Sequence, residues 1–248
     1  MHEQKELPSA QELQPSDQRA KLAITLVWIV MALNMLSLGS GYYSYQLLCQ
    51  IEEGIEVPLD VASKSDLLEL VIAIGYLVAF VISGVTFLRW FTRAYSNLKL
   101  RTPYTDHTMP WVWASWFVPI ISAFRPFKIM SELYRRTSTL LSEAGADLQN
   151  RHTSAVLGWW WALWLVSNVV TNASLRYSMT AESVEELINV AIINLIDNAI
   201  GIPLAVITVK VIHDYAKLES RLFDIDQAVV IDDTMLPPND TDPSEQPS

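Results

Sequence analysis

Cysteine, glycine and charge are all scarce in this chain. A single cysteine, Cys49, among 248 residues excludes an intramolecular disulfide and any cysteine-based metal framework. The four histidines are scattered without the spacing of metal ligands. No phosphate-binding loop, nucleophile elbow or zinc-protease helix is present, so the sequence predicts no catalytic residue, no metal and no cofactor.

Charged residues make up only 18% of the chain, against roughly 25% in soluble globular proteins. They are unevenly spread, and long stretches carry none. The net charge of −10 and the lack of a basic stripe argue against nucleic acid as a partner. Such a distribution is typical of a chain that lies partly in hydrocarbon and partly in water.

Four long apolar runs take the place of the missing charges, at about residues 22–48, 67–91, 155–175 and 187–212. Each reaches the roughly 20 residues that cross a hydrocarbon core of about 30 Å, and a helix pairs its own backbone groups in lipid. The first run is longer than the apolar core of a secretory signal, although small residues at 39–41 leave cleavage as a minor alternative. The predicted fold class is an all-α integral membrane protein with about four transmembrane helices.

Polar segments flank this predicted membrane domain, which covers residues 22–213. Residues 1–21 have few large apolar side chains, and residues 214–248 are acidic and contain prolines. Because neither segment can bury enough surface to offset the entropy of ordering, both are predicted to be flexible or disordered tails. An inner loop, residues 92–154, separates the second and third runs.

The positions of lysine and arginine predict the orientation. All of them except Lys64 and Arg176 lie before the first run, around the inner loop, or at and beyond the end of the fourth run. The positive-inside rule assigns that side to the cytoplasm. We therefore expect a multi-pass protein of a bacterial inner membrane, with the N-terminus and C-terminus both cytoplasmic.

Residues 111–124, within the inner loop, form an apolar segment that is too short to span and is interrupted by Pro119. Because tryptophan favours the headgroup level, this Trp-rich segment is predicted to be re-entrant or interfacial. The residues after it alternate at helical spacing between an apolar and a basic face, which predicts a cytoplasmic amphipathic helix. That helix would lie either on an anionic leaflet or on the inner end of the bundle.

Basic and aromatic residues around this loop are candidates for contact with lipid or a protein partner. For the arginines where the second run ends, the simpler interpretation is side chains that extend to the interface. The candidates are Arg89, Arg93, Asn97, Trp111, Trp113, Trp116, Arg125, Lys128, Arg135 and Arg136.

The fourth run contains one acidic residue, Asp197, about ten residues from its outer end. Asn194 and Asn198 share its helix face, and Asn34 and Asn168 fall at a similar depth in the first and third runs. This polar cluster could be a proton or cation site. The simpler interpretation is interhelical hydrogen bonding, worth about 0.6 kcal/mol per contact.

The stretch at residues 87–97 contains the pattern Trp-x-x-Arg-Ala-x-x-Asn, from Trp90 to Asn97. Pro110-Trp111 opens a second block that includes residues 116–119, and residues 126–133 follow. Together these motifs resemble a bacterial membrane family catalogued as domain of unknown function 4328 (DUF4328), over roughly residues 70–210. The resemblance implies a multi-helix bacterial membrane protein and supplies no catalytic residue, cofactor or substrate.

Three classes of function remain open from the sequence. The leading hypothesis is a non-enzymatic membrane scaffold or regulator that uses its inner loop to hold lipid or a cytoplasmic protein partner, and its acidic tail to recruit a basic protein. The alternative is a small transporter or oligomeric channel around Asp197, and small residues in the second run leave a homo-oligomer open. A lipid-modifying enzyme that uses Asp106, His107 or Glu132 is the least favoured.

Overall fold

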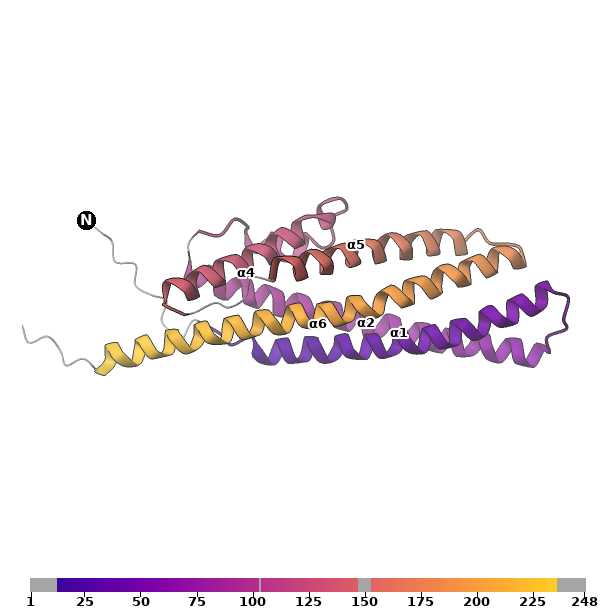
Figure 1. Cartoon of the computed structure of the whole chain (residues 1–248), viewed down its shortest axis with the longest axis horizontal. Coiled ribbons are helices and arrows are strands. Elements are labelled where there is room, and N and C mark those ends of the chain that lie inside the picture. Colours follow the sequence, from indigo (N-terminus) through magenta and orange to yellow (C-terminus); the bar gives the residue numbers. More distant parts are fainter. Residues whose placement is uncertain (1–12, 103, 147–152, 236–248) are drawn as a thin grey trace, which may run out of the picture.

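The computed structural model describes residues 13–102, 104–146 and 153–235, and every regular element in these ranges is a helix. Four long helices run roughly along one axis, and three short elements lie beside one end of them (Figure 1). The long helices are α1 (Asp17–Glu52), α2 (Leu59–Arg101), α5 (Thr153–Ser178) and α6 (Val184–Met235). The short elements are α3 (Met109–Ala114), the 3₁₀ turn η1 (Ile121–Ala123) and α4 (Arg125–Glu143).

The four long helices contain the four predicted apolar runs and are long and apolar enough to cross a membrane. Their outward side chains are large and apolar: on α2, Leu70, Val71 and Leu77 are each more than half exposed. An exposed apolar surface of this extent fits lipid as the surrounding medium. The predicted all-α fold with four transmembrane helices is therefore confirmed, and the chain is a multi-pass membrane protein.

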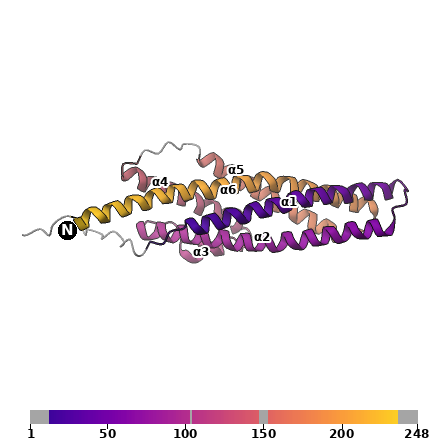
Figure 2. The same ribbon diagram turned by 90° about the horizontal axis from the view of Figure 1, so that it is seen from below.

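Helix α1 has the most extensive contacts in the bundle, because it packs along both α2 and α6, while α5 packs on α6 (Figure 2). The turn from α1 to α2 is set by local chemistry. Gly54 adopts φ 79°, a left-handed conformation that ends helices, and Pro58 precedes the first residue of α2.

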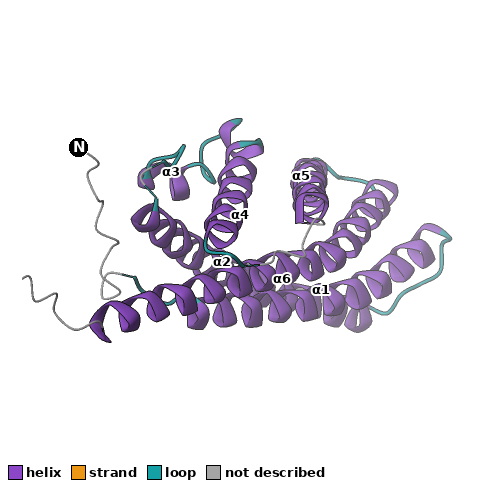
Figure 3. Ribbon diagram, turned by 60° about the vertical axis from the view of Figure 1, so that its left-hand side comes forward, coloured by secondary structure: helices purple, strands orange, loops and turns teal. Residues whose placement is uncertain are grey.

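The two ends of the bundle differ in charge. We call the end where α1 begins and α2 ends the basic end, and the end with the α1–α2 and α5–α6 turns the acidic end. Helices α3 and α4 lie at the basic end, away from the α1–α2 turn (Figure 3). The deeply buried core lies there too: its largest members include Trp90, Phe91, Tyr95, Leu133 and Tyr215.

The predicted tails are shorter in the structure than in the sequence analysis. Helix α6 continues to Met235, so the prediction of a disordered tail was wrong for residues 214–235. Ile212, Tyr215, Leu218 and Leu222 recur at helical spacing and are buried, which extends the helix beyond its apolar run. Residues 236–248 lie outside the described residues.

At the other terminus, α1 begins at Asp17. Leu13, Ser16 and Ala20 are buried, so the predicted flexible tail was also wrong for residues 13–21. The reason is that these few small or apolar side chains find partners on α2 and α6, which sequence position alone does not show. Residues 1–12 lie outside the described ranges.

Candidate functional site

Helix α4 carries the central residue of the basic end, Glu132. The helix starts at Arg125 with Pro126 in its first turn, a position where the missing N–H costs nothing. Its apolar face, with Ile129, Met130 and Leu133, is fully buried. The structure places α4 against α2, α5 and α6, which is the second of the two placements that the sequence left open for this amphipathic helix.

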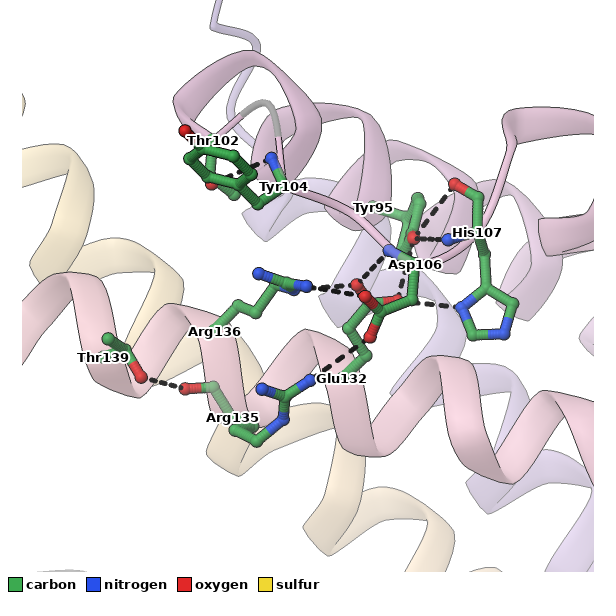
Figure 4. Close-up of polar contacts among 9 residues, drawn as sticks. All are labelled: Tyr95, Thr102, Tyr104, Asp106, His107, Glu132, Arg135, Arg136 and Thr139. Atoms are coloured by element: carbon green, nitrogen blue, oxygen red, sulfur yellow. Dashed lines mark hydrogen bonds and ion pairs between the residues drawn. The ribbon is translucent and has the colours of Figure 1, made fainter.

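Glu132 is only 3% exposed and both of its carboxylate oxygens are engaged (Figure 4). One oxygen, Oε1, accepts hydrogen bonds from the Asp106 backbone N–H at 2.6 Å and from Arg136 Nε at 2.8 Å. The other, Oε2, accepts one from the Tyr95 hydroxyl at 2.9 Å and lies 2.9 Å from His107 Nδ1. We call these five residues the Glu132 cluster; they join α2, the loop before α3, and α4.

The electrostatics of the Glu132 cluster favour the charged carboxylate. Burial by itself raises the pKa of Glu132. The hydrogen bonds from Asp106, His107, Tyr95 and Arg136 lower the pKa by more than burial raises it, so the net pKa is below its usual value. For the basic Arg136, burial lowers the pKa, but its hydrogen bonds to Glu132 and Asp106 raise the pKa above its usual value. The cluster is thus a charge-balanced tie between the loop and α4.

Asp106 extends this network to the surface. Its carboxylate lies 2.7 Å from Arg136 and 3.3 Å from Arg135. Arg136 was predicted to contact lipid or a partner, but its side chain is 19% exposed and held by two acids. Arg135 is 63% exposed and keeps an outward-facing surface.

The tryptophans of the predicted interfacial segment have three different environments. Trp116 packs among aromatic rings of α2 and α5, in contact with Phe87, Phe91 and Trp164. The ring of Trp111 lies under the Arg125 guanidinium, 4.2 Å from it, whereas Trp113 remains 53% exposed.

The segment at residues 111–124 does not span, because it folds as the six-residue α3 and the three-residue η1. The indole of Trp161 donates a hydrogen bond to the Ala123 carbonyl at 2.9 Å and ties η1 to α5. Lys128 lies 5.7 Å from the Phe124 ring and stays exposed. Trp116, which lies between α3 and η1, packs beside two of the predicted apolar runs.

Asn97 is not an interfacial residue, and this prediction was wrong. Its side chain is 1% exposed and donates to Glu219 at 2.7 Å and to the Gln14 carbonyl at 2.9 Å. Ser16 also donates to Glu219. The face of α2 that bears Asn97 packs against the start of α1 and the extension of α6. This contact was not predicted, because the fourth helix was expected to end at residue 212 and Glu219 lies beyond that residue.

The extension of α6 is clamped a second time by Arg101. Arg101 lies 2.8 Å from Asp226, with 6% of its side chain exposed, and its guanidinium lies 4.4 Å from the ring centre of Phe223. Neither Asp226 nor Glu219 was a candidate from the sequence. Their spacing of seven residues, with apolar neighbours at 215, 218 and 222, was the available signal for one continuing helix face.

Arg89 and Arg93 line a groove at the basic end together with Arg19 of α1. Arg19 donates a hydrogen bond at 3.4 Å to the backbone carbonyl of Arg89. Arg19 was not predicted, because the N-terminal segment was interpreted as a tail.

The polar cluster around Asp197 is only partly assembled. Asp197 accepts hydrogen bonds from Thr171 at 2.7 Å and Ser167 at 3.3 Å, both on α5. Asn194 accepts one from Ser174. Asn168 instead donates to the Trp164 carbonyl of its own helix and is exposed, so it lies outside the cluster.

Asn34 and Asn198 face other parts of the bundle. Asn34 is 5% exposed and lies so close to Gly201 that a β-carbon there would collide with its amide. Asn198 lines a cavity of about 590 Å³ with Asp197 and Asn194. Glu69 and Asp66 of α2 line the same cavity, as do Ser37, Ser40 and Ser44 of α1.

Comparison with known proteins gives one result. No curated protein and no solved structure matches the chain. Within the part of the chain that the structure describes, no group of three or more His, Cys, Asp or Glu residues could hold a metal ion. Residues 54–217 match the family described as "Domain of unknown function (DUF4328)". This range begins in the α1–α2 turn and includes the whole Glu132 cluster, and the chain belongs to this family.

Proposed function

We propose that the protein is a non-enzymatic scaffold or regulator in a bacterial inner membrane, with both termini in the cytoplasm. Its working surface would be the cap, which we define as residues 104–143, together with the end of α6. The observation that carries this proposal is the Glu132 cluster, which fixes the loop before α3 onto α4 through a fully engaged buried carboxylate.

The distribution of the core supports the same proposal. The basic end has a core like that of a soluble domain, with Tyr95, Met130 and Leu133 fully buried. The long helices elsewhere carry mostly exposed apolar side chains, as lipid solvation requires. A rigid folded surface beside the membrane is what a partner-binding site needs, because pre-organisation lowers the entropy cost of binding.

The state of Glu132 argues against a catalytic role. Its oxygens have four partners, and its pKa below the usual value leaves it without a proton to donate at neutral pH. His107 has 13% of its side chain exposed and is held against Glu132 by Nδ1. These features support a structural tie, in line with the non-enzymatic proposal.

The distribution of charge supports the proposed orientation. Arg19, Arg89, Arg93, Arg125 and Lys128 all belong to the basic end, and the acidic end has Glu52, Glu53 and Glu56 in one turn and Glu182, Glu185 and Glu186 in the other. Under the positive-inside rule, this difference in charge supports a cytoplasmic location for the cap and both termini.

The proposal is tested by photo-crosslinking in living cells. A photoreactive residue at Ser142, on the exposed end of α4, should give discrete adducts, while one at Thr180, in the turn at the acidic end, serves as the matched control. The adducts should disappear in an E132Q background that leaves the protein in the membrane. Adducts that persist in E132Q, or that form only at Thr180, would refute a working surface on the cap.

A second candidate function, a small transporter or channel, has one observation in its favour. The cavity of about 590 Å³ is lined by Asp197, Glu69 and Asp66 together with hydroxyl groups, between helices that cross the membrane. Proton or cation flux into proteoliposomes that D197N abolishes, and E132Q does not, would favour this function over the scaffold. Equal background flux in both variants and in the unmodified protein would exclude it.

A further inference from the structure

Three arginines lie close together at the basic end, and none of them pairs with an acidic side chain of the described residues. Arg19 of α1 reaches Arg89 of α2, and Arg93 lies one turn further along the same helix. Burial lowers the pKa of the Arg19 guanidinium, and the nearby positive charges of Arg93 and Arg89 lower it further. In the described residues, none of them lies within 4.0 Å of a carboxylate, whereas Arg101, Arg135 and Arg136 at the same end all do. This local excess of positive charge favours the binding of an anion.

The arginines stand beside an apolar groove of about 580 Å³. Its other walls are formed by Val85 and Leu88 of α2, by Trp113 of α3 and by Phe117. Trp113 is 53% exposed and Phe117 is 68% exposed, so this wall is open to the surroundings of the bundle. A ligand that fills the groove must therefore be charged at one side and apolar at the other.

The position of the groove along α2 matches the two parts of a phospholipid. Val85 and Leu88 belong to the apolar run that crosses the membrane, while Arg93 and Ser96 follow after its end. The charged side of the groove thus lies at headgroup level, and the apolar side lies deeper. A free phosphate ion would use only the first of these two parts.

We propose that this groove binds one anionic phospholipid. The phosphate is held by the guanidinium groups of Arg19, Arg89 and Arg93, which suit the planar, bidentate recognition of phosphate oxygens. One acyl chain lies along Val85, Leu88 and Phe117. Basic pockets between transmembrane helices on the cytoplasmic side bind anionic headgroups in this way. The site goes beyond the proposed function, and it stands or falls independently of any protein partner at the cap.

Native mass spectrometry of the full chain in neutral detergent, with added phosphatidylglycerol, tests this site. The R89Q/R93Q variant should bind the first phosphatidylglycerol about 30-fold more weakly, from a loss of about 2 kcal/mol for two arginines near the surface. The matched control K128Q/R135Q removes two positive charges at the same end but outside the groove, and should bind normally. Phosphatidylcholine should bind weakly to all forms.

A second variant keeps the test decisive if removal of arginines disturbs folding. S96E places a carboxylate among the three arginines, which supplies the missing anion from within and should abolish lipid binding without loss of thermal stability. Equal binding of phosphatidylglycerol in R89Q/R93Q, S96E and K128Q/R135Q would overturn the proposal. So would displacement of the lipid by millimolar inorganic phosphate, which would indicate a simple anion site. In either case the crosslinks at Ser142 would still report on the cap.

Discussion

The substitution E132Q removes the charge at the centre of the cap while keeping the size of the side chain. In the folded protein, the Glu132 carboxylate accepts from the Asp106 N–H, the Tyr95 hydroxyl and Arg136 Nε. A glutamine amide puts an NH₂ group in place of one acceptor oxygen, so donors then face a donor. Hydrogen bonds to charged groups contribute about 1.5–3 kcal/mol each, and loss of one buried partner of an ion pair costs about 3–5 kcal/mol.

E132Q should lower the stability of the cap by about 3 kcal/mol, near the lower limit for loss of a buried ion pair. The lower limit applies because the Arg136 side chain is 19% exposed and still pairs with Asp106 at 2.7 Å. This cost should appear as local opening of the loop before α3. Hydrogen–deuterium exchange of the amides at residues 105–112 should therefore accelerate about a hundredfold, since each 1.4 kcal/mol is a factor of ten. Amides in the middle of α1 should not change.

The matched control is R135Q. Arg135 contacts the same loop through Asp106, but at 3.3 Å and with 63% of its side chain exposed, so its ion pair contributes less than about 1 kcal/mol. Exchange in R135Q should stay within about fivefold of the unmodified protein. If E132Q and R135Q exchange at the same rate, the Glu132 cluster does not hold the cap together and the reasoning fails.

Glu132, Gly201 and Arg101 each give one further prediction. The pKa of Glu132 is lower in the folded state than in the unfolded state, so its contribution to stability is complete above the unfolded pKa of about 4.3 and is lost as pH falls through the folded pKa. The difference in melting temperature between the unmodified protein and E132Q should therefore shrink below about pH 4. G201A should destabilise the bundle by about 1–3 kcal/mol in thermal melts, since the new methyl group collides with Asn34, and N34A should relieve the effect; an unchanged melting temperature for G201A would contradict this packing. R101A should expose the end of α6 to protease, because Arg101 lies 2.8 Å from Asp226, whereas R221A, at an exposed position on the same helix, should not.

The sequence predicts much of the membrane part of this fold. The four apolar runs and the non-spanning segment at residues 111–124 follow from length, charge and the position of Pro119. The ends of the helices are harder to predict, because the apolar spacing beyond Ile212 is interrupted by acidic residues that composition alone assigns to a tail. Glu219 and Asp226 instead contact Asn97 and Arg101 of α2, so these acidic residues belong to a packed helix face.

The candidate site was predicted only in its parts. Asp106, His107 and Glu132 could be named from the sequence, but their convergence depends on the path of a loop, which periodicity does not determine. Tyr95 gave no polar signal of its own, because an aromatic residue at helical spacing indicates a core position. Asn97 was predicted to contact lipid or a partner because it follows Arg89 and Arg93 at four-residue spacing, although only the two arginines line the groove.

The side of the membrane on which the cap lies can be measured directly. Single cysteines at Ser63, Thr139 and Ser183, in a C49S background, can be probed in intact cells with an impermeant thiol reagent. We expect the cysteines at positions 63 and 183, at or near the turns of the acidic end, to react in intact cells. The cysteine at position 139, exposed on α4, should react only after the membrane is opened. Labelling of the Thr139 site in intact cells would place the cap outside the cytoplasm and contradict the proposed function.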